Sequence, residues 1–212
     1  MKSLLKFVVG VIIFVAIFAI IGRLFFFDIG KTANYSMVPN IIPGDIFLFR
    51  KAGATGLLGK GDVAVCHNPD DVSSLVVGRI VGVPGDTFRL VDNHFHFGHR
   101  MIQHDYTNPV IYFDTSTEEQ IKYVIRKATE KLGGTVYEIG FMDTSRGRNF
   151  EETVVPDHHF FLVGDNRNMA YDSRNFGFVP IDSCLGEAVF LLWASETNGD
   201  LKQSERSISW IH

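Results

Sequence analysis

The feature that most constrains this chain is a long apolar run near its N-terminus. The stretch 7–22 contains no charged side chain, and after Arg23 the apolar residues continue to Phe27. A helix over about 4–27 is long enough to cross the roughly 30 Å hydrocarbon core of a bilayer, while Lys6 and Arg23 extend toward the headgroups at its ends. The run therefore predicts a transmembrane helix.

Two other interpretations of this run are a cleaved signal peptide and a buried core helix. A signal peptide has a shorter apolar region that ends in a small-x-small cleavage site. Here the run is longer and is followed by Arg23, three Phe residues and Asp28. We therefore predict an uncleaved anchor over residues 1–31, and the slight excess of basic residues before the run favours a cytoplasmic N-terminus.

The charge of the chain argues against one class of partner. The formal net charge is −4, although the anchor region 1–31 is itself basic, so the body 32–212 is acidic. Nucleic-acid-binding proteins normally carry a basic excess, which makes nucleic acid a poor candidate partner. The 212 residues allow one good-sized domain beside the anchor.

The body has the pattern of a mainly β protein. Short β-branched or aromatic runs are bounded by Gly-Asp and Pro-Gly turns. The predicted strands include Ile46 to Phe49, Val63 to Cys66, Leu75 to Val83 and Phe160 to Val163.

One helix is predicted within the body. Ser116 and Glu119 have the spacing of a capping box, an apolar stripe runs from Ile121 to Leu132, and Gly133-Gly134 follows it. The surrounding residues 91–158 are polar and irregular, so we expect an inserted subdomain that contains this helix. It would separate two parts of a β core, residues 32–90 and 159–212.

The cysteines and histidines allow more than one interpretation. Cys66 and Cys184 lie in apolar sequence, which favours buried free thiols over a disulfide. Neither has the spacing of a zinc site. His94 and His96 alternate with apolar residues, which favours a surface-exposed hairpin over a metal site.

Candidate chemistry lies in four segments of the body. A Ser before a Pro-containing turn is most often only a turn residue, but here it occurs with three further motifs. In chain order the segments are Ser36-Met37-Val38-Pro39, Gly78–Asp86 with its Pro-Gly-Asp ending, Gly164-Asp165-Asn166-Arg167 and Asp172-Ser173-Arg174. Together, and behind an N-terminal anchor, they resemble bacterial type I signal peptidases, the membrane-bound serine proteases that remove signal peptides from exported proteins.

The resemblance implies a single transmembrane helix followed by a coiled all-β catalytic core on the periplasmic side of the bacterial cytoplasmic membrane. It implies signal-peptide-bearing preproteins as substrates, cleavage after small-x-small sites, contact with membrane lipid, and no cofactor or metal. Ser36 matches the nucleophile of the family. A serine hydroxyl is a weak nucleophile until a base takes its proton.

Two positions depart from the family pattern. The general base of the family is a Lys, and that position is Gly78 here, beside Arg79, which stays protonated. The Ser that orients this Lys in the family is replaced by Ala170. An oxyanion-stabilising Ser two residues before the nucleophile is replaced by Asn34, whose amide can still donate to an oxyanion together with Ser36.

Other family positions are retained. By the resemblance, Arg79 with Asp165 and Asp172 with Arg174 form structural ion pairs. Three apolar residues match the lining that accepts small side chains near the cleavage site, with plain core packing as the alternative. They are Met37, Ile41 and Val77.

Three functions follow from this pattern. The first is a working signal peptidase in which another group, such as Lys51, Lys60 or His67, replaces the Lys. The second is an inactive paralogue that binds signal peptides or partners an active peptidase. The third is a specialised peptidase that matures pilin or conjugation subunits.

Overall fold

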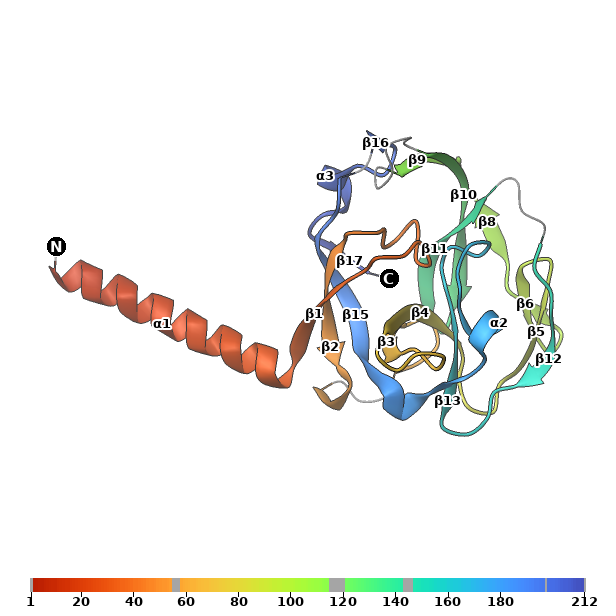
Figure 1. Ribbon diagram of the computed structural model, residues 1–212, viewed down its shortest axis with the longest axis horizontal. Coiled ribbons are helices and arrows are strands. Elements are labelled where there is room, and N and C mark those ends of the chain that lie inside the picture. Colours follow the sequence, from red (N-terminus) through yellow and green to blue (C-terminus); the bar gives the residue numbers. More distant parts are fainter. Residues whose placement is uncertain (1, 55–57, 115–120, 143–146, 197, 212) are drawn as a thin grey trace.

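A computed structural model describes residues 2–54, 58–114, 121–142, 147–196 and 198–211 of the chain. Helix α1 (Lys2–Phe25) projects from a β body, and the strand that follows it enters that body directly (Figure 1). Two one-turn helices, α2 (Ser173–Phe176) and α3 (Gln203–Arg206), lie on the body. The mainly β architecture behind an N-terminal helix agrees with the sequence prediction.

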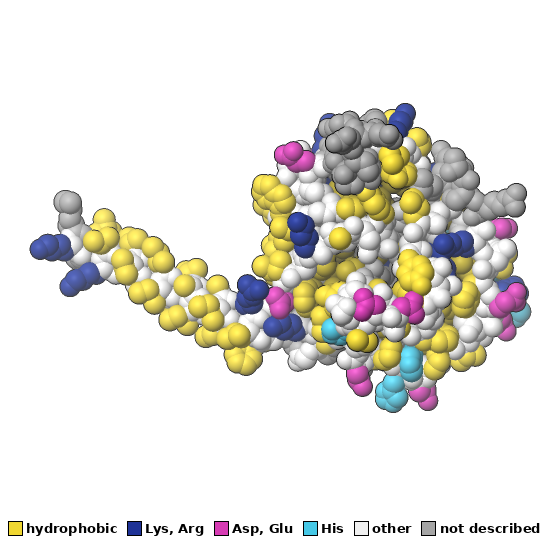
Figure 2. All heavy atoms as spheres, viewed as in Figure 1, with side chains coloured by type: hydrophobic (Ala, Val, Ile, Leu, Met, Phe, Trp, Pro, Cys, Tyr) yellow, Lys and Arg dark blue, Asp and Glu magenta, His cyan; other side chains and the backbone are white. Residues whose placement is uncertain are grey.

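Helix α1 has the length and composition of a membrane span. Its segment Leu4–Phe25 is apolar, and none of it is buried against the rest of the protein. Figure 2 shows hydrophobic side chains along the whole helix and basic side chains at its outer end and where it meets the body. An exposed apolar surface of this extent requires a nonpolar environment.

The largest sheet has eight strands and curls around the core. Its hydrogen-bonded order is β1-β2-β15-β3-β4-β13-β14, with β17 paired to β15. The strands are β1 (Phe27–Lys31), β2 (Ile46–Lys51), β15 (Cys184–Trp193), β3 (Val63–His67), β4 (Leu75–Gly82), β13 (His159–Val163), β14 (Val179–Pro180) and β17 (Ser209–Trp210). All four strands predicted from the sequence are present.

Within the described part of the chain, the open strand edges of this sheet include those of β1 and of the first half of β4. β1 pairs only with β2. The first half of β4 pairs with β3, whereas the β13 register on its other side begins at Arg79. The backbone of Leu75–Gly78 therefore has one side without a strand neighbour.

Two smaller sheets hold most of residues 91–158. One contains β11 (Thr135–Met142), β10 (Ile121–Leu132), β9 (Val110–Asp114), β16 (Asn198–Gly199) and β8 (His104–Tyr106). The other contains β12 (Phe150–Val154), β5 (Thr87–Val91), β6 (His94–Phe97) and β7 (Arg100–Met101). The division into an inserted subdomain and a two-part core stays a prediction.

The predicted helix within this region is wrong from Ile121 onward, while Ser116 and Glu119 lie outside the described residues. Residues 121–132 form the strand β10, which pairs with β11 from Ile125 to Leu132 and with β9 and β8 on its other side. Sheet pairing on both edges outweighs the local helical pattern. The buried residues Ala128, Glu130 and Leu132 alternate along the strand, and the charge at Glu130 hid this alternation in the sequence.

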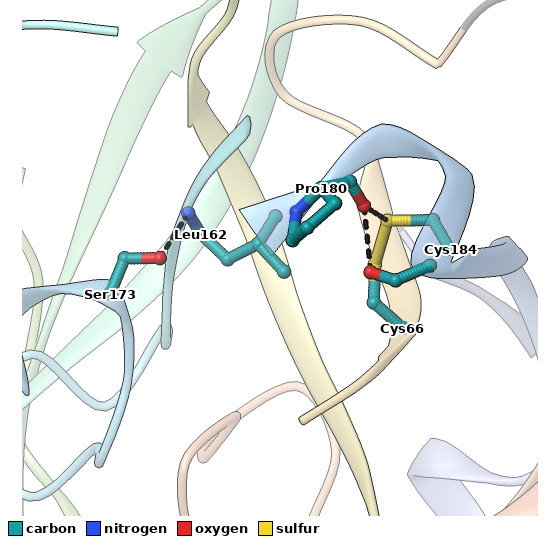
Figure 3. Close-up of a disulfide and its surroundings, with 6 residues drawn as sticks. Cys66, Leu162, Ser173, Pro180 and Cys184 are labelled. Carbon is teal, nitrogen blue, oxygen red and sulfur yellow. Dashed lines mark hydrogen bonds between the residues drawn. A yellow bond between two sulfur atoms is a disulfide. The ribbon is translucent and has the colours of Figure 1, made fainter. Parts of the chain in front are cut away.

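The expectation of free thiols is also wrong, because Cys66 and Cys184 form a disulfide (Figure 3). Cys66 on β3 stands directly opposite Cys184 on β15 in the strand register. The two cysteines are 118 residues apart in sequence, so only the sheet pairing brings them together.

The histidine-containing hairpin is present. β5 and β6 pair with Val91 opposite His94, and the turn residues Asp92 and Asn93 have positive φ angles. His94 and His96 are half-buried on either side of the buried Phe95. The hairpin is therefore less exposed than the sequence suggested.

Candidate functional site

Ser36 lies in the segment between β1 and β2, and only 9% of its surface is exposed. Its carbonyl oxygen accepts a hydrogen bond from the backbone N–H of Asn166 at 2.9 Å. The side-chain amide of Asn166 also donates to the Tyr35 carbonyl at 3.1 Å. Asn166 of the Gly-Asp-Asn-Arg motif thus fixes the backbone at Tyr35 and Ser36.

Gly164 explains why this motif begins with glycine. A Cβ atom at this position would overlap the Ser36 carbonyl oxygen and the Cβ atom of Ala170. The Gly164 N–H is held by the Asp172 carboxylate at 2.9 Å. Ser36 and Ala170 therefore both pack against the backbone at Gly164, although they are far apart in sequence.

Gly78 of β4 lies beside Leu162 and Val163, which directly precede Gly164. It pairs with Ala64 of β3, and a Cβ atom at Gly78 would lie 3.1 Å from the Leu162 Cβ. Leu162 is fixed in turn, because its N–H donates to the Ser173 hydroxyl at 3.0 Å (Figure 3). The structure thus gathers Ser36, Gly78 and Ala170 around residues 162–166.

Two ion pairs hold this segment from both sides. Arg79 binds Asp165 through two hydrogen bonds of 2.8 and 2.7 Å, and both side chains are fully buried. Arg174 binds Asp172 in the same two-point manner, at 2.8 and 2.6 Å. Two-point pairing fixes orientation as well as distance.

A groove of about 450 Å³ extends to Asn34, two residues before Ser36 and hydrogen-bonded to it. One wall is the stretch 28–34, which includes β1, and the opposite wall includes Leu75 and Val77 of β4. The remaining lining residues are apolar: Phe47, Phe49, Val65 and Leu185. Val77 thus lines the groove, whereas Met37 and Ile41 are buried in the core cluster against which Val77 packs.

Asn34 lines the groove with its side chain turned toward the backbone. Its Oδ1 accepts a hydrogen bond from the Ser36 N–H at 3.1 Å. An oxyanion at Ser36 would need that same N–H group. If this N–H is an oxyanion donor, as the sequence resemblance implies, the Asn34 oxygen occupies it in this arrangement.

No described residue is hydrogen-bonded to the Ser36 hydroxyl, and the three candidate bases have other partners. Lys60 pairs with Asp86 at 2.7 Å. Lys51 lies 3.8 Å from Asp28. His67 contacts the Val72 carbonyl at 2.9 Å through Nδ1.

Sequence reasoning missed a buried polar cluster behind this site. Glu130 of β10 is 1% exposed and binds Arg167 at 2.7 and 3.0 Å. Tyr137 donates its hydroxyl to Glu130 at 2.7 Å, and His104 Nε2 lies 2.9 Å from the same carboxylate. Arg167 was visible in its motif, but nothing in the local pattern pointed to Glu130.

This cluster shifts the ionisation of its members. Burial acts to raise the pKa of the Glu130 carboxyl, but the Arg167 charge and the hydrogen bonds from its neighbours outweigh burial and lower it. Burial lowers the pKa of His104, although Glu130 acts against that shift. Glu130 is therefore ionised at neutral pH and needs its cationic partner.

Among the residues that the structure describes, no three His, Cys, Asp or Glu side chains are grouped to hold a metal ion. The groups gathered at Ser36 are a hydroxyl, backbone amides and an apolar groove.

Comparison with known proteins identifies the family. A model described as "Signal peptidase, peptidase S26" matches residues 4–193. Signal peptidase I of Rickettsia typhi is 31% identical over 144 residues, which cover 65% of this chain and 53% of that protein. Signal peptidase I of Rickettsia felis is 32% identical over 143 residues, 64% of this chain and 52% of that protein.

The chain spans about half the length of these curated relatives. A crystal structure of a signal peptidase I from Enterococcus faecalis aligns with a TM-score of 0.40 and 20% identity, covering 62% of this chain and 97% of that one. The family model accounts for the anchor and for every segment that meets at Ser36. The chain belongs to the signal peptidase family, peptidase S26.

Proposed function

We propose that this chain is a membrane-anchored signal peptidase I-type serine endopeptidase that binds the end of a signal peptide in the groove beside Ser36. The bound segment would lie extended between β1 and the first half of β4. Cleavage would follow a small-x-small sequence and would use the Ser36 hydroxyl as nucleophile.

The observation that carries this proposal is the pair of open strand edges flanking the groove. The free backbone of β1 lies along one wall and that of Leu75–Val77 along the other. An extended peptide between them would gain main-chain hydrogen bonds, while its alternate side chains would enter the apolar lining. This mode of recognition does not depend on a Lys at position 78.

A second candidate is a protein that binds signal peptides without cleaving them. Three observations favour it: Gly78 supplies no base, Ala170 supplies no hydroxyl, and Asn34 occupies the Ser36 N–H. A proton leaving the Ser36 hydroxyl needs an acceptor within hydrogen-bond reach or one water away. Such a protein would regulate export or accompany an active peptidase.

The location that we propose is the bacterial cytoplasmic membrane, with the body on its periplasmic side. The apolar helix α1 supports anchoring. The Cys66–Cys184 disulfide supports the orientation, because disulfides persist in oxidising compartments and are rare in the cytosol.

The test is cleavage and binding of a preprotein that carries an Ala-x-Ala site, with the full chain in detergent. Three proteins are compared: the native chain, Ser36→Ala, and the double variant Gly78→Lys/Ala170→Ser. The Lys at position 78 requires only a small shift of Leu162, because the contact of its Cβ atom is 3.1 Å.

Cleavage by the native chain but not by Ser36→Ala would support the peptidase and would start the search for its base. Binding without cleavage, with cleavage gained in the double variant, would support the second candidate. Absence of binding in all three proteins would contradict both functions.

A further inference from the structure

The buried carboxylate of Glu130 joins the sheet of β10 and β11 to the segment that holds Ser36. The described residues make four hydrogen bonds to its carboxylate: two from Arg167, one from Tyr137 and one with His104. A buried carboxylate is stable only when it is paired and hydrogen-bonded in this way. Glu130 and Arg167 are therefore each dependent on the other.

Arg167 is linked to the nucleophile through one intervening residue. Its backbone N–H donates to the Gly140 carbonyl at 2.9 Å, and the Gly140 N–H donates to the Asp165 carbonyl at 2.9 Å. Between these two anchor points stands Asn166, whose N–H holds the Ser36 carbonyl. Movement of Arg167 would therefore move the amide that fixes Ser36.

The two ends of this segment are held differently. The Asp165 end is held by Arg79 of β4 and by Asn40, whose amide donates to Asp165 at 2.7 Å. Both Asp165 oxygens accept hydrogen bonds from these donors, and the described hydrogen bonds of the Arg167 side chain go to Glu130. At the Arg167 end, Glu130 neutralises the guanidinium, the Gly140 carbonyl of β11 accepts from the backbone N–H, and Arg174 Nη1 donates to the Arg167 carbonyl at 2.7 Å. Of these contacts, only the one with Glu130 holds the Arg167 side chain.

Neighbouring side chains fix the position of Glu130 itself. Tyr137 binds one of its oxygens, and the Tyr137 ring also lies against the Arg79 guanidinium, with 3.7 Å between the guanidinium carbon and the ring centre. His104 binds the other oxygen and stacks on His94, with 4.2 Å between ring centres. Arg167, which follows Asn166, and Arg79, which binds Asp165 before it, are therefore both in contact with this one cluster.

We propose that Glu130 is a positioning residue for the site. It fixes Arg167, and through Arg167 it holds the Asn166 amide against the Ser36 carbonyl. The strands β10 and β11 thereby set the position of the Ser36 backbone beside the groove. This proposal rests on the proposed function only in taking Ser36 as the centre of the site.

The experiment is hydrogen exchange of the full chain in detergent, read by mass spectrometry without any peptide ligand. Glu130→Gln removes the charge at nearly constant shape, and Glu130→Asp restores it on a shorter side chain. Glu187→Gln is the matched control, because Glu187 pairs with Arg50 at 2.5 Å on strands away from Asn166. Leu90→Ala is a control for destabilisation, since Leu90 is 1% exposed in the core shared with β10 and β11.

The expected result for Glu130→Gln is faster exchange in residues 34–40 and 164–170, by about tenfold more than in β5 and β6. Glu130→Asp should restore part of the protection. Glu187→Gln should leave both segments unchanged, and Leu90→Ala should not favour them over β5 and β6. Equal acceleration of all regions by Glu130→Gln, or acceleration confined to β10 and β11, would overturn the proposal.

A folding failure of Glu130→Gln would move the test to Tyr137→Phe, which removes one hydrogen bond to Glu130 and keeps the ring. The same two segments should then respond by a smaller factor, and no response would overturn the proposal. Peptide binding is measured separately on the same proteins. If the native chain does not bind the peptide, the proposed function is contradicted. The exchange pattern would still decide the role of Glu130.

Discussion

At the scale of single residues, the site depends on glycines, whose missing side chains leave space for neighbouring atoms. Gly164 leaves space for the Ser36 carbonyl and for Ala170, and the backbone of Asn166 then reaches Ser36. A side chain at position 78 would place its Cβ atom against Leu162, and Gly78 leaves that position empty. Close packing of backbone against backbone is what permits residues distant in sequence to share this small volume.

Gly164→Ala should destabilise the protein and displace Ser36. The added methyl group overlaps the Ser36 carbonyl oxygen and Ala170, so we expect the free energy of unfolding to fall by about 1–3 kcal/mol. Denaturant unfolding of the full chain measures this loss. Gly53→Ala is the control, because a Cβ atom at Gly53 has no neighbour within 4 Å; equal stability of the two variants would contradict the prediction.

Asn34→Ser should improve the chemistry of the site. The change removes the oxygen that accepts the Ser36 N–H and introduces a hydroxyl that can donate to an oxyanion. In whichever protein cleaves the Ala-x-Ala preprotein, native or Gly78→Lys/Ala170→Ser, we expect the rate constant to rise by about tenfold or more. Single-turnover cleavage measures it, and an unchanged or lower rate would argue against an occupied donor.

At the scale of elements, the disulfide ties the middle of the large sheet. It joins β3 to β15 next to Val65 and Leu185, which both line the groove. β15 in turn pairs with β2, the neighbour of β1. The cross-link between β3 and β15 is thus connected to β1, which forms one wall of the groove, through the pairings of β15 with β2 and of β2 with β1.

Replacing both cysteines by alanine should lower the free energy of unfolding by about 2–4 kcal/mol, because the cross-link restricts the unfolded chain. Urea unfolding of the native chain, with and without dithiothreitol, is compared with that of Cys66→Ala/Cys184→Ala. The reductant should destabilise the native chain and leave the double variant unaffected. Equal stability of the oxidised native chain and the double variant would mean that the bond adds nothing.

At the scale of the whole molecule, the anchor and the groove are directly connected. α1 ends at Phe25, and β1 begins at Phe27 and forms part of a groove wall. The Glu130 cluster connects the sheet of β10 and β11 to the same site through Arg167. The stability of the body and the geometry at Ser36 therefore share one set of buried charges.

Acidification should destabilise the whole body through His104. Burial lowers the pKa of His104 from its ordinary value of 6.5, so the unfolded chain binds this proton more readily than the folded protein does. The charged or titratable groups that face it are Glu130, Arg167 and His94. The free energy of unfolding should thus fall as the pH drops below about 6.5.

Urea unfolding at several pH values between about 5 and 7.5 tests this dependence, a range that spans the ordinary histidine pKa. His104→Gln keeps a donor for Glu130 but does not titrate, so its free energy of unfolding should vary less with pH. Leu90→Ala should be less stable at every pH yet keep the native slope. An unchanged slope in His104→Gln would assign the effect to other groups.

Local sequence was sufficient to predict the apolar helix, the four strands and the motifs that meet at Ser36. These features are written in local patterns: the length of an apolar run, β-branched residues between turns, and short ordered motifs. Of the Gly-Asp pairs that the sequence suggests as turns, those beginning at Gly44, Gly61 and Gly85 have a glycine with a positive φ angle.

Asn34 turns its oxygen toward the nearby Ser36 N–H, a conformation that the sequence did not predict. The strand β10, the Cys66–Cys184 bond and the cluster at Glu130 are set by contacts between separate segments. Each depends on a partner that local sequence does not reveal: Cys184 is 118 residues from Cys66, and Arg167 is 37 residues from Glu130. In a sequence, a buried Glu in a strand cannot be told from an exposed Glu in a helix unless its cationic partner is known. The free energy that fixes these features comes from pairing across the sheets, which a local pattern does not contain.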